Sequence, residues 1–169
     1  MKVLFSDLIS KRERSKDLEY SFDMDKFTFS GEEIVPTEKV LVNGKIISNN
    51  TELLLDLNIK TVLKLVCSRC LETFIYPIDI DIEERFTNDD AIEDDDVTFV
   101  KGDTLDITEI VESVIISTLP IKRICSSNCK GLCQTCGENL NKSSCNCNDE
   151  GNIDVRFAGL KALLENKEV

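Results

Sequence analysis

The stretch Leu53-Leu-Leu-Asp-Leu-Asn-Ile-Lys-Thr-Val-Leu-Lys-Leu65 alternates between apolar and polar side chains along most of its length. The apolar phase consists of Leu53, Leu55, Leu57, Ile59, Leu63 and Leu65, and Thr61 completes it. Successive side chains of a strand point to opposite faces of a sheet, so a period of two residues is typical of a strand. This stretch therefore predicts a long antiparallel strand with one buried and one solvent-facing side.

A second alternating stretch begins after Cys70. Its apolar phase holds Phe74, Tyr76, Ile78, Ile80 and Ile82, and its polar phase holds Asp79, Asp81 and Glu83. Pro77 cannot donate to a strand ladder, so we expect an edge strand or a bulge there. The two stretches predict a long hairpin with Cys67-Ser-Arg-Cys70 at or near its tip.

The segment 39–48 is also strand-like, with Asn43-Gly44 in its middle. Asn-Gly indicates either a hairpin turn or a bulge within one longer strand, and both readings remain open. Elsewhere the sequence predicts a short strand over 3–5, a strand from 20 towards 29, a loop over 31–36 and a turn at 48–50.

Two helices are expected towards the C-terminal end. Asp106 is placed to cap the first, with Glu109 three residues further on, and Pro120 ends it. Its apolar side chains recur at helical spacing: Ile107, Ile110, Val111, Val114, Ile115 and Leu119. Asp154 can cap a last helix with Phe157, Leu160 and Leu164 on one face.

The cysteines are concentrated in two places. Six of the 8 lie between Cys125 and Cys147, and Cys67 and Cys70 form the other group. Two- and three-residue gaps between thiolates are typical of a tetrahedral zinc site, because one tight turn presents two sulfurs to one ion. The chain contains 0 His, so only all-cysteine sites are possible for such a metal.

The spacing favours two zinc sites with four cysteines each. Cys133, Cys136, Cys145 and Cys147 form the more self-contained set, and Gly131 and Gly137 allow the tight turns around it. Cys125 and Cys129 are then left to pair in space with Cys67 and Cys70. The alternative, in which Cys125 and Cys129 join the downstream cysteines, remains open.

The predicted fold class is α+β. It consists of a curved antiparallel sheet or partly open barrel, one or two packed helices and a C-terminal cysteine-rich zinc-binding segment. Residues 1–120 would form the sheet and helix. Residues 121–150 would form the zinc-binding segment, packed on the hairpin tip at 67–70, and residues 151–169 the last helix.

The charge of the chain is strongly negative, at -12, and two four-cysteine zinc sites would lower it further. An acidic protein repels phosphate backbones, so a basic protein partner is easier to accommodate than naked nucleic acid. Asp7 interrupts any signal-peptide core, and no apolar run approaches the length of a membrane span. We therefore expect a cytoplasmic protein, in a reducing compartment where clustered cysteines indicate metal rather than disulfides.

No catalytic residue is predicted. A catalytic zinc keeps an open position, and no histidine is present to act as a base. The enzyme-class alternative is a thiol-disulfide oxidoreductase that uses Cys67-Ser-Arg-Cys70, which would require a lowered thiol pKa.

Five segments resemble those of the YceD family, the large ribosomal RNA subunit accumulation proteins of bacteria and plastids. They are Cys67-Ser-Arg-Cys-Leu-Glu72, Ser117-Thr-Leu-Pro120, Cys129-Lys-Gly-Leu-Cys-Gln-Thr-Cys-Gly-Glu-Asn-Leu-Asn141, Cys145-Asn-Cys147 and Asp154-Val-Arg-Phe-Ala-Gly-Leu160. Gln134 and Val155 stand where the family often has proline, and neither is a predicted ligand. The resemblance runs from about residue 60 to the end of the chain.

The resemblance implies a role in accumulation or processing of 23S-type rRNA, and hence in ribosome biogenesis, with no catalytic residues. Our hypothesis is an acidic adaptor for a basic large-subunit ribosomal or assembly protein. The predicted partner-binding residues are Asp89, Asp90, Glu93, Asp94, Asp95 and Asp96. The alternative is direct contact with rRNA through Lys122, Arg123 and Lys130, together with Lys11, Arg12 and Arg14. No membrane or small-molecule substrate is expected.

Overall fold

A computed structural model describes residues 1–10, 15–49, 52–90 and 94–147. The chain forms two compact units. The first, here called the sheet unit, comprises Met1–Val66 and Thr73–Arg123. The second, here called the cysteine unit, comprises Cys67–Glu72 and the chain from Ile124 onward, which is described to Cys147. The predicted helix over 151–169 lies outside the described residues.

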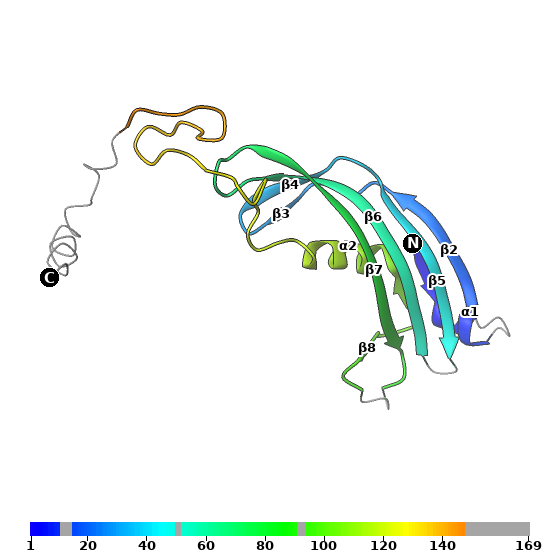
Figure 1. The fold of residues 1–169 in the computed structure, drawn as a ribbon. Helices are drawn as coiled ribbons and strands as arrows, with labels where there is room; N and C mark the ends of the chain where they lie inside the picture. The colour runs from blue at the N-terminus through cyan, green and yellow to red at the C-terminus, as the bar shows by residue number, and fades with distance from the viewer. Residues whose placement is uncertain (11–14, 50–51, 91–93, 148–169) are drawn as a thin grey trace, which may run out of the picture. The chain divides into compact units, whose positions relative to one another are not determined.

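The sheet unit is built on one mainly antiparallel sheet whose edges do not close into a barrel (Figure 1). Its strands are β2 (Ser15–Phe22), β3 (Phe27–Phe29), β4 (Glu32–Pro36), β5 (Val40–Asn49), β6 (Glu52–Val66), β7 (Thr73–Thr87) and β8 (Val97–Phe99). β5 and β4 follow each other along one edge of β6, and β7 runs along the other edge. Among these described strands, only β8 is parallel to its neighbour, β7. The predicted open, curved sheet is therefore confirmed.

The long hairpin of β6 and β7 is the centre of this sheet. Its register is uninterrupted from Glu52 opposite Thr87 to Val66 opposite Thr73. The apolar phase of β6 is fully buried, as the alternation predicted, and its other phase is partly or fully exposed. Because the hairpin is regular, the segment that joins its strands is Cys67–Glu72, as expected.

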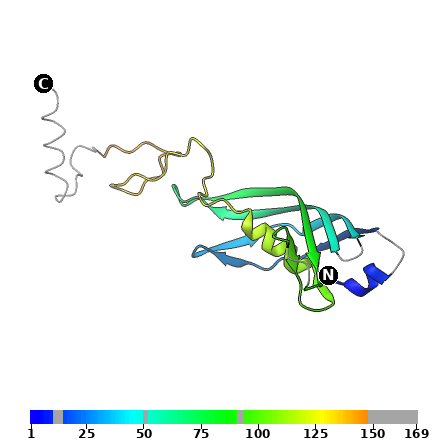
Figure 2. The ribbon, with the colours of Figure 1, turned by 90° about the horizontal axis from the view of Figure 1, so that it is seen from below.

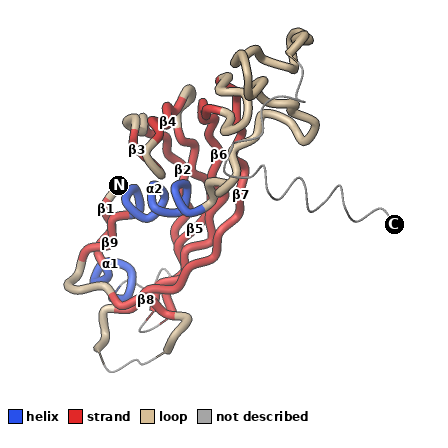
Figure 3. The backbone as a smooth tube through the Cα atoms, turned by 90° about the vertical axis from the view of Figure 1, so that its left-hand side faces the viewer, coloured by secondary structure: helices blue, strands red, loops and turns tan. Residues whose placement is uncertain are grey.

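One face of the sheet is covered by helix α2 (Ile107–Ser117), as Figures 2 and 3 show. Ile107, Val111 and Ile115 are buried in the core that includes the apolar phase of β6. The Asp106 side chain caps the helix by accepting a hydrogen bond from the N–H of Thr108 at 3.1 Å. The apolar stripe of this helix therefore serves core packing.

β1 (Lys2–Leu4) and β9 (Thr104–Asp106) form a separate two-stranded sheet. β9 leads directly into α2, and β1 leads directly into the short helix α1 (Phe5–Ser10). The predicted strand over 3–5 thus ends one residue early. Phe5 begins a short helix instead, and its side chain is fully buried in the core. The sequence showed no helical period here because α1 is only 6 residues long.

The loop predicted over 31–36 is wrong, since β4 begins at Glu32 and pairs with β3. Phe29 lies opposite Glu32, so the connection is the two-residue turn Ser30-Gly31. Both residues have positive φ, 52° and 80°, as a type I′ hairpin turn requires. The single strand that was expected from residue 20 towards 29 is divided into β2 and β3.

Neither reading of Asn43-Gly44 is correct, because β5 passes through it without a turn or a bulge. A Cβ atom at Gly44 would lie 2.1 Å from the backbone oxygen of Asp56 and 2.8 Å from the Cα of Leu57. The glycine therefore allows β6 to approach β5 closely.

Candidate metal centres

The eight cysteines lie in two clusters of four within the cysteine unit. The first cluster combines Cys67 and Cys70, from the turn between β6 and β7, with Cys125 and Cys129. The Sγ atoms of Cys67 and Cys129 are 3.9 Å apart, and those of Cys70 and Cys125 are 3.8 Å apart. This is the grouping that the spacing favoured.

The sulfurs of the first cluster fit a tetrahedral ion. Four sulfurs that each lie about 2.3 Å from zinc at tetrahedral corners are about 3.8 Å from one another. The two measured separations, 3.9 and 3.8 Å, agree with that edge length. Cys67, Cys70 and Cys129 are buried, so three of the four sulfurs are shielded from water.

The second cluster consists of Cys133, Cys136, Cys145 and Cys147. Its four sulfurs lie within 4.8 Å of one another, as those of the first cluster do. Both clusters can therefore hold a metal ion through cysteine alone.

The two Cys-x-x-Cys turns have the same backbone hydrogen bonds. In the first, the Cys67 N–H donates to the Glu72 carbonyl and the Leu71 N–H donates to the Cys67 carbonyl, both at 2.9 Å. In the second, Cys133 bonds with the two equivalent positions, Glu138 and Gly137, at 2.8 and 2.9 Å. The chain thus uses one turn geometry twice.

The residue after the second cysteine has positive φ in both turns. The φ of Gly137 is 76°, which suits glycine. Leu71 occupies the equivalent place with a φ of 59°, and its side chain is 65% exposed. A leucine in this conformation is strained, because its Cβ approaches the following carbonyl oxygen.

Backbone amides in both turns point at sulfur. Burial raises the pKa of Cys67, but N–H groups of Cys125, Cys70 and Arg69 outweigh it and lower this pKa to about 6. In the second turn, the N–H groups of Cys136 and Thr135 are the main causes that lower the pKa of Cys133 to about 6. Amides in this arrangement favour the thiolate, which is the form that binds metal.

One thiol in each cluster resists ionisation most strongly, Cys125 in the first and Cys147 in the second. Burial, followed by the neighbouring thiols, raises the pKa of Cys125 to about 12. The neighbouring thiol of Cys136 is the main cause that raises the pKa of Cys147 to about 12. Four thiolates at these separations repel one another, and a bound cation relieves that repulsion.

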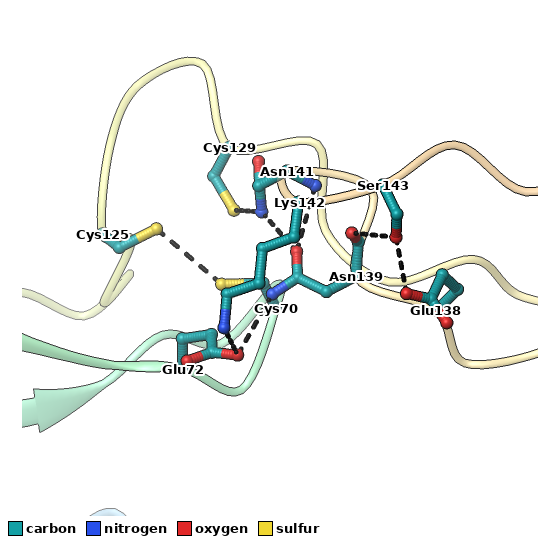
Figure 4. A network of polar contacts seen from close by, with 9 residues as sticks. All are labelled: Cys70, Glu72, Cys125, Cys129, Glu138, Asn139, Asn141, Lys142 and Ser143. Atoms are coloured by element: carbon teal, nitrogen blue, oxygen red, sulfur yellow. Dashed lines mark hydrogen bonds and ion pairs between the residues drawn. The ribbon is translucent and has the colours of Figure 1, made fainter.

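A polar network surrounds the first cluster (Figure 4). The Asn141 side chain donates from Nδ2 to the Sγ of Cys129 at 3.3 Å, and its Oδ1 accepts the N–H of Lys130 at 2.7 Å. Glu72 accepts from Lys142 at 2.6 Å and from Asn139 at 3.3 Å. The loop between Cys136 and Cys145 therefore contacts both parts of the first cluster.

Gly131 brings the two parts of the first cluster together. Its φ is 80°, and a Cβ there would lie 3.1 Å from the backbone oxygen of Arg69. The following N–H, of Leu132, donates to the same oxygen at 3.1 Å. The sequence predicted this glycine only as a residue of the tight turns around Cys133. In the structure it also lets the backbone approach the Cys67–Glu72 turn closely.

Local sequence pattern did not reveal Asn139, Asn141 and Lys142 as supports of the cysteine clusters. Their partners are distant in sequence, since Lys142 and Glu72 are separated by 70 residues. Of these three residues, only Asn139 and Asn141 gave a signal in the local sequence, because asparagine side chains commonly form hydrogen bonds to the backbone in loops.

The predicted acidic partner residues lie in the sheet unit, and those that the structure describes are exposed: Asp89, Asp90, Asp94, Asp95 and Asp96. Glu93 lies outside the described residues. Asp94 is held by Arg85 at 3.5 Å and accepts the N–H of Asp96. This loop thus presents carboxylates to solvent.

The basic residues named for RNA contact lie in different settings. Arg123 is buried, with its Nε 3.4 Å from Glu32 and its Nη1 donating to the Phe29 carbonyl at 3.2 Å. Its guanidinium is therefore engaged in the sheet unit and not presented to a polyanion. Lys122 and Lys130 are exposed, and Lys11, Arg12 and Arg14 lie outside the described residues.

Comparison with known proteins identifies relatives over most of the chain. A sequence profile described as "Large ribosomal RNA subunit accumulation protein YceD" matches residues 55–164. "Uncharacterized protein YlbN" of Bacillus subtilis (strain 168) is 30% identical over 98% of this chain and 97% of its own length. No solved structure matches significantly.

Two plant proteins are also similar, both called "Large ribosomal RNA subunit accumulation protein YCED homolog 1, chloroplastic". The Zea mays protein is 29% identical over 66% of this chain and 50% of its own length. The Arabidopsis thaliana protein is 29% identical over 66% of this chain and 44% of its own length. The chain thus spans about half the length of these plant relatives. No helix among the described residues is long and apolar enough to span a membrane.

Proposed function

The chain belongs to the YceD family of large ribosomal RNA subunit accumulation proteins, and on this premise we propose that it supports accumulation of 23S-type rRNA. We propose that it acts as a non-catalytic, zinc-binding adaptor for a basic large-subunit ribosomal or assembly protein. The observation that carries the zinc-binding part is the cluster of Cys67, Cys70, Cys125 and Cys129, with sulfur separations of 3.8 and 3.9 Å.

Zinc is the metal that best fits the donors. Tetrahedral sites with four thiolates take zinc or iron, and zinc has no redox chemistry of its own. The cysteines that would hold it are Cys67, Cys70, Cys125 and Cys129 in one site, and Cys133, Cys136, Cys145 and Cys147 in the other. Such ions would supply folding free energy, and the ion of the first site would join two segments that are distant in sequence.

A structural role follows from the ligand number. Four cysteines fill a tetrahedral coordination shell and leave no position for water or substrate. The chain has 0 His, so the commonest general base is missing as well.

The adaptor role is supported by charge. The chain carries -12, and exposed carboxylates gather between residues 89 and 96. Phosphate backbones are repelled by such a surface, whereas lysine- and arginine-rich proteins that themselves bind rRNA are attracted. The adaptor would thus act on rRNA through a protein.

The test is complementation in cells that lack this gene, with the ratio of large- to small-subunit rRNA as readout. Wild type should restore the ratio, whereas Cys67→Ser/Cys70→Ser and the charge variant Asp89→Asn/Asp90→Asn/Asp95→Asn/Asp96→Asn should not. Lys122→Ala/Lys130→Ala is the matched charge control and should restore it. Restoration by the carboxylate variant but not by the lysine variant, with naked rRNA co-purifying, would establish direct RNA contact instead.

A further inference from the structure

Strand β7 has a long open edge. β6 pairs with it along its whole length on one side. On the other side, among the described residues, only β8 pairs with it, opposite Arg85, Phe86 and Thr87. Backbone groups from Thr73 to Glu84 that point away from β6 therefore have no strand partner in the described part of the chain.

The backbone of Val62 shows which groups of β7 face this edge. Its carbonyl accepts the N–H and the hydroxyl of Thr37, at 2.8 and 3.0 Å, on the side of β6 opposite β7. Val62 and its partner Pro77 are therefore a non-hydrogen-bonded pair, and the nitrogen of Pro77 faces the open edge. By the two-residue period, the N–H groups of Asp79, Asp81 and Glu83 face it too.

Pro77 limits where a further strand can pair. It offers no donor to the open edge, so a regular ladder is interrupted at this point. The stretch Ile78–Glu84, here called the β7 edge, retains its donors and acceptors up to the place where β8 begins to pair. This length suffices for a short added strand.

The outward side chains of the β7 edge are acidic. Asp79 is paired with Lys60 at 2.9 Å, and Asp81 accepts a hydrogen bond from Asn58 at 2.8 Å. Among the described residues, no lysine or arginine lies within ion-pair distance of Asp81 or Glu83. Glu83 lies directly opposite Asp56, whose carboxylate is paired with Lys45 at 3.3 Å.

The opposite face of the same edge is apolar. Ile80 and Ile82 pack against the core yet remain only half-buried. Beyond them lies a cleft of about 640 Å³ between the end of β7, β8 and α2. Its lining includes Phe86, Val100 and Val114, with Glu84 also in the wall.

We infer that the β7 edge receives an extended segment of a basic protein partner as an added strand. The inference rests on the proposed adaptor role and specifies its docking surface. The segment alternates lysine or arginine with aliphatic residues. Its basic side chains face Asp81 and Glu83, and its aliphatic side chains cover Ile80 and Ile82 and enter the cleft. Main-chain hydrogen bonds supply affinity, and the alternating side chains supply specificity.

The test uses a labelled, acetylated peptide of alternating lysine and valine, about nine residues long to match a short strand, with the full zinc-loaded chain, followed by fluorescence anisotropy. Two matched peptides are N-methylated, one at the odd and one at the even positions. Each methylation phase removes the donors on one edge of the strand and retains the charge. We expect at least one of these two peptides to bind about tenfold more weakly than the unmethylated peptide, because several hydrogen bonds are lost.

The protein variants separate backbone from charge. Asp81→Pro removes the N–H that faces the open edge, as Pro77 does naturally, and should weaken the unmethylated peptide about tenfold more than Asp81→Asn does. Equal binding by Asp81→Pro and Asp81→Asn would overturn the inference. So would equal binding of the unmethylated peptide and both methylated phases, a comparison that needs no protein variant.

These outcomes are distinct from failure of the proposed function. Peptide binding that weakens with salt but is unchanged by methylation would be consistent with an acidic adaptor and would exclude strand addition. If the adaptor role itself is wrong, the variant Asp89→Asn/Asp90→Asn/Asp95→Asn/Asp96→Asn should restore the ratio of large- to small-subunit rRNA.

Discussion

The Nδ2 atom of Asn141 lies 3.3 Å from the sulfur of Cys129, to which it donates a hydrogen bond. Asn141 belongs to the loop between Cys136 and Cys145 of the second cluster, whereas Cys129 belongs to the first. The two candidate metal centres are therefore coupled through one side chain. A hydrogen bond to a thiolate favours its charged form, so Asn141 is expected to strengthen metal binding at the first cluster.

Replacing Asn141 with alanine should lower the affinity of the first site for zinc by about 10- to 100-fold, the usual effect of losing such a supporting bond. Competition against a chromophoric zinc chelator measures this. Asn146→Ala is the matched control, because Asn146 is exposed and lies between two cysteines of the second cluster. Equal affinities for the two variants would show that Asn141 does not support the site.

Gly44→Ala should destabilise the sheet unit by about 3 kcal/mol, because the new Cβ would collide with the backbone of β6. Chemical denaturation measures the loss. Gly102 also has positive φ, at 101°, but a Cβ there meets nothing within 4 Å. Gly102→Ala should therefore cost only about 1 kcal/mol. A smaller effect at Gly44 than at Gly102 would contradict the close approach of β5 and β6.

Leu71→Gly should stabilise the zinc-loaded protein by up to about 1 kcal/mol, since it relieves the positive φ of Leu71. The reverse exchange in the second turn, Gly137→Leu, should destabilise by a similar amount. Thermal unfolding at fixed zinc concentration measures both. Destabilisation by Leu71→Gly would mean that this exposed side chain makes a stabilising contact.

Lys60→Met should raise the pKa of Asp79 towards its ordinary value. Hydrogen bonds from Lys60 and Asn58 hold this pKa low in the folded protein. The stabilisation is present above the unfolded pKa, about 3.9, and is lost as pH falls through the lower folded pKa. Carboxyl NMR titration checks this. Lys64→Met, on the same face of β6, should leave Asp79 unchanged, and an equal shift in both variants would exclude a specific pair.

The regular parts of the fold were predictable from local pattern. Alternation over β6 and β7 identified both strands and the turn that carries Cys67 and Cys70, because the apolar face of β6 is buried and that of β7 is partly buried against a single core. The helix α2 followed from its cap at Asp106 and its apolar stripe.

The remaining features depend on contacts that local pattern does not contain. Asn43-Gly44 carries a hairpin signal, yet its glycine serves the approach of a neighbouring strand. Ser30-Gly31 forms a turn whose first residue is not one of those that favour positive φ. Asn141 supports a sulfur that belongs to the other cluster, and no spacing rule relates the two residues.

The most direct test of the zinc-stabilised architecture is the zinc content per chain in protein purified under reducing conditions, with cysteine pairs replaced by serine. We predict two zinc ions in the wild type, and loss of the same single ion in Cys67→Ser/Cys70→Ser and in Cys125→Ser/Cys129→Ser. Cys133→Ser/Cys136→Ser should lose the other ion. One zinc ion in the wild type, with Cys67 and Cys70 free and rapidly alkylated, would contradict the account.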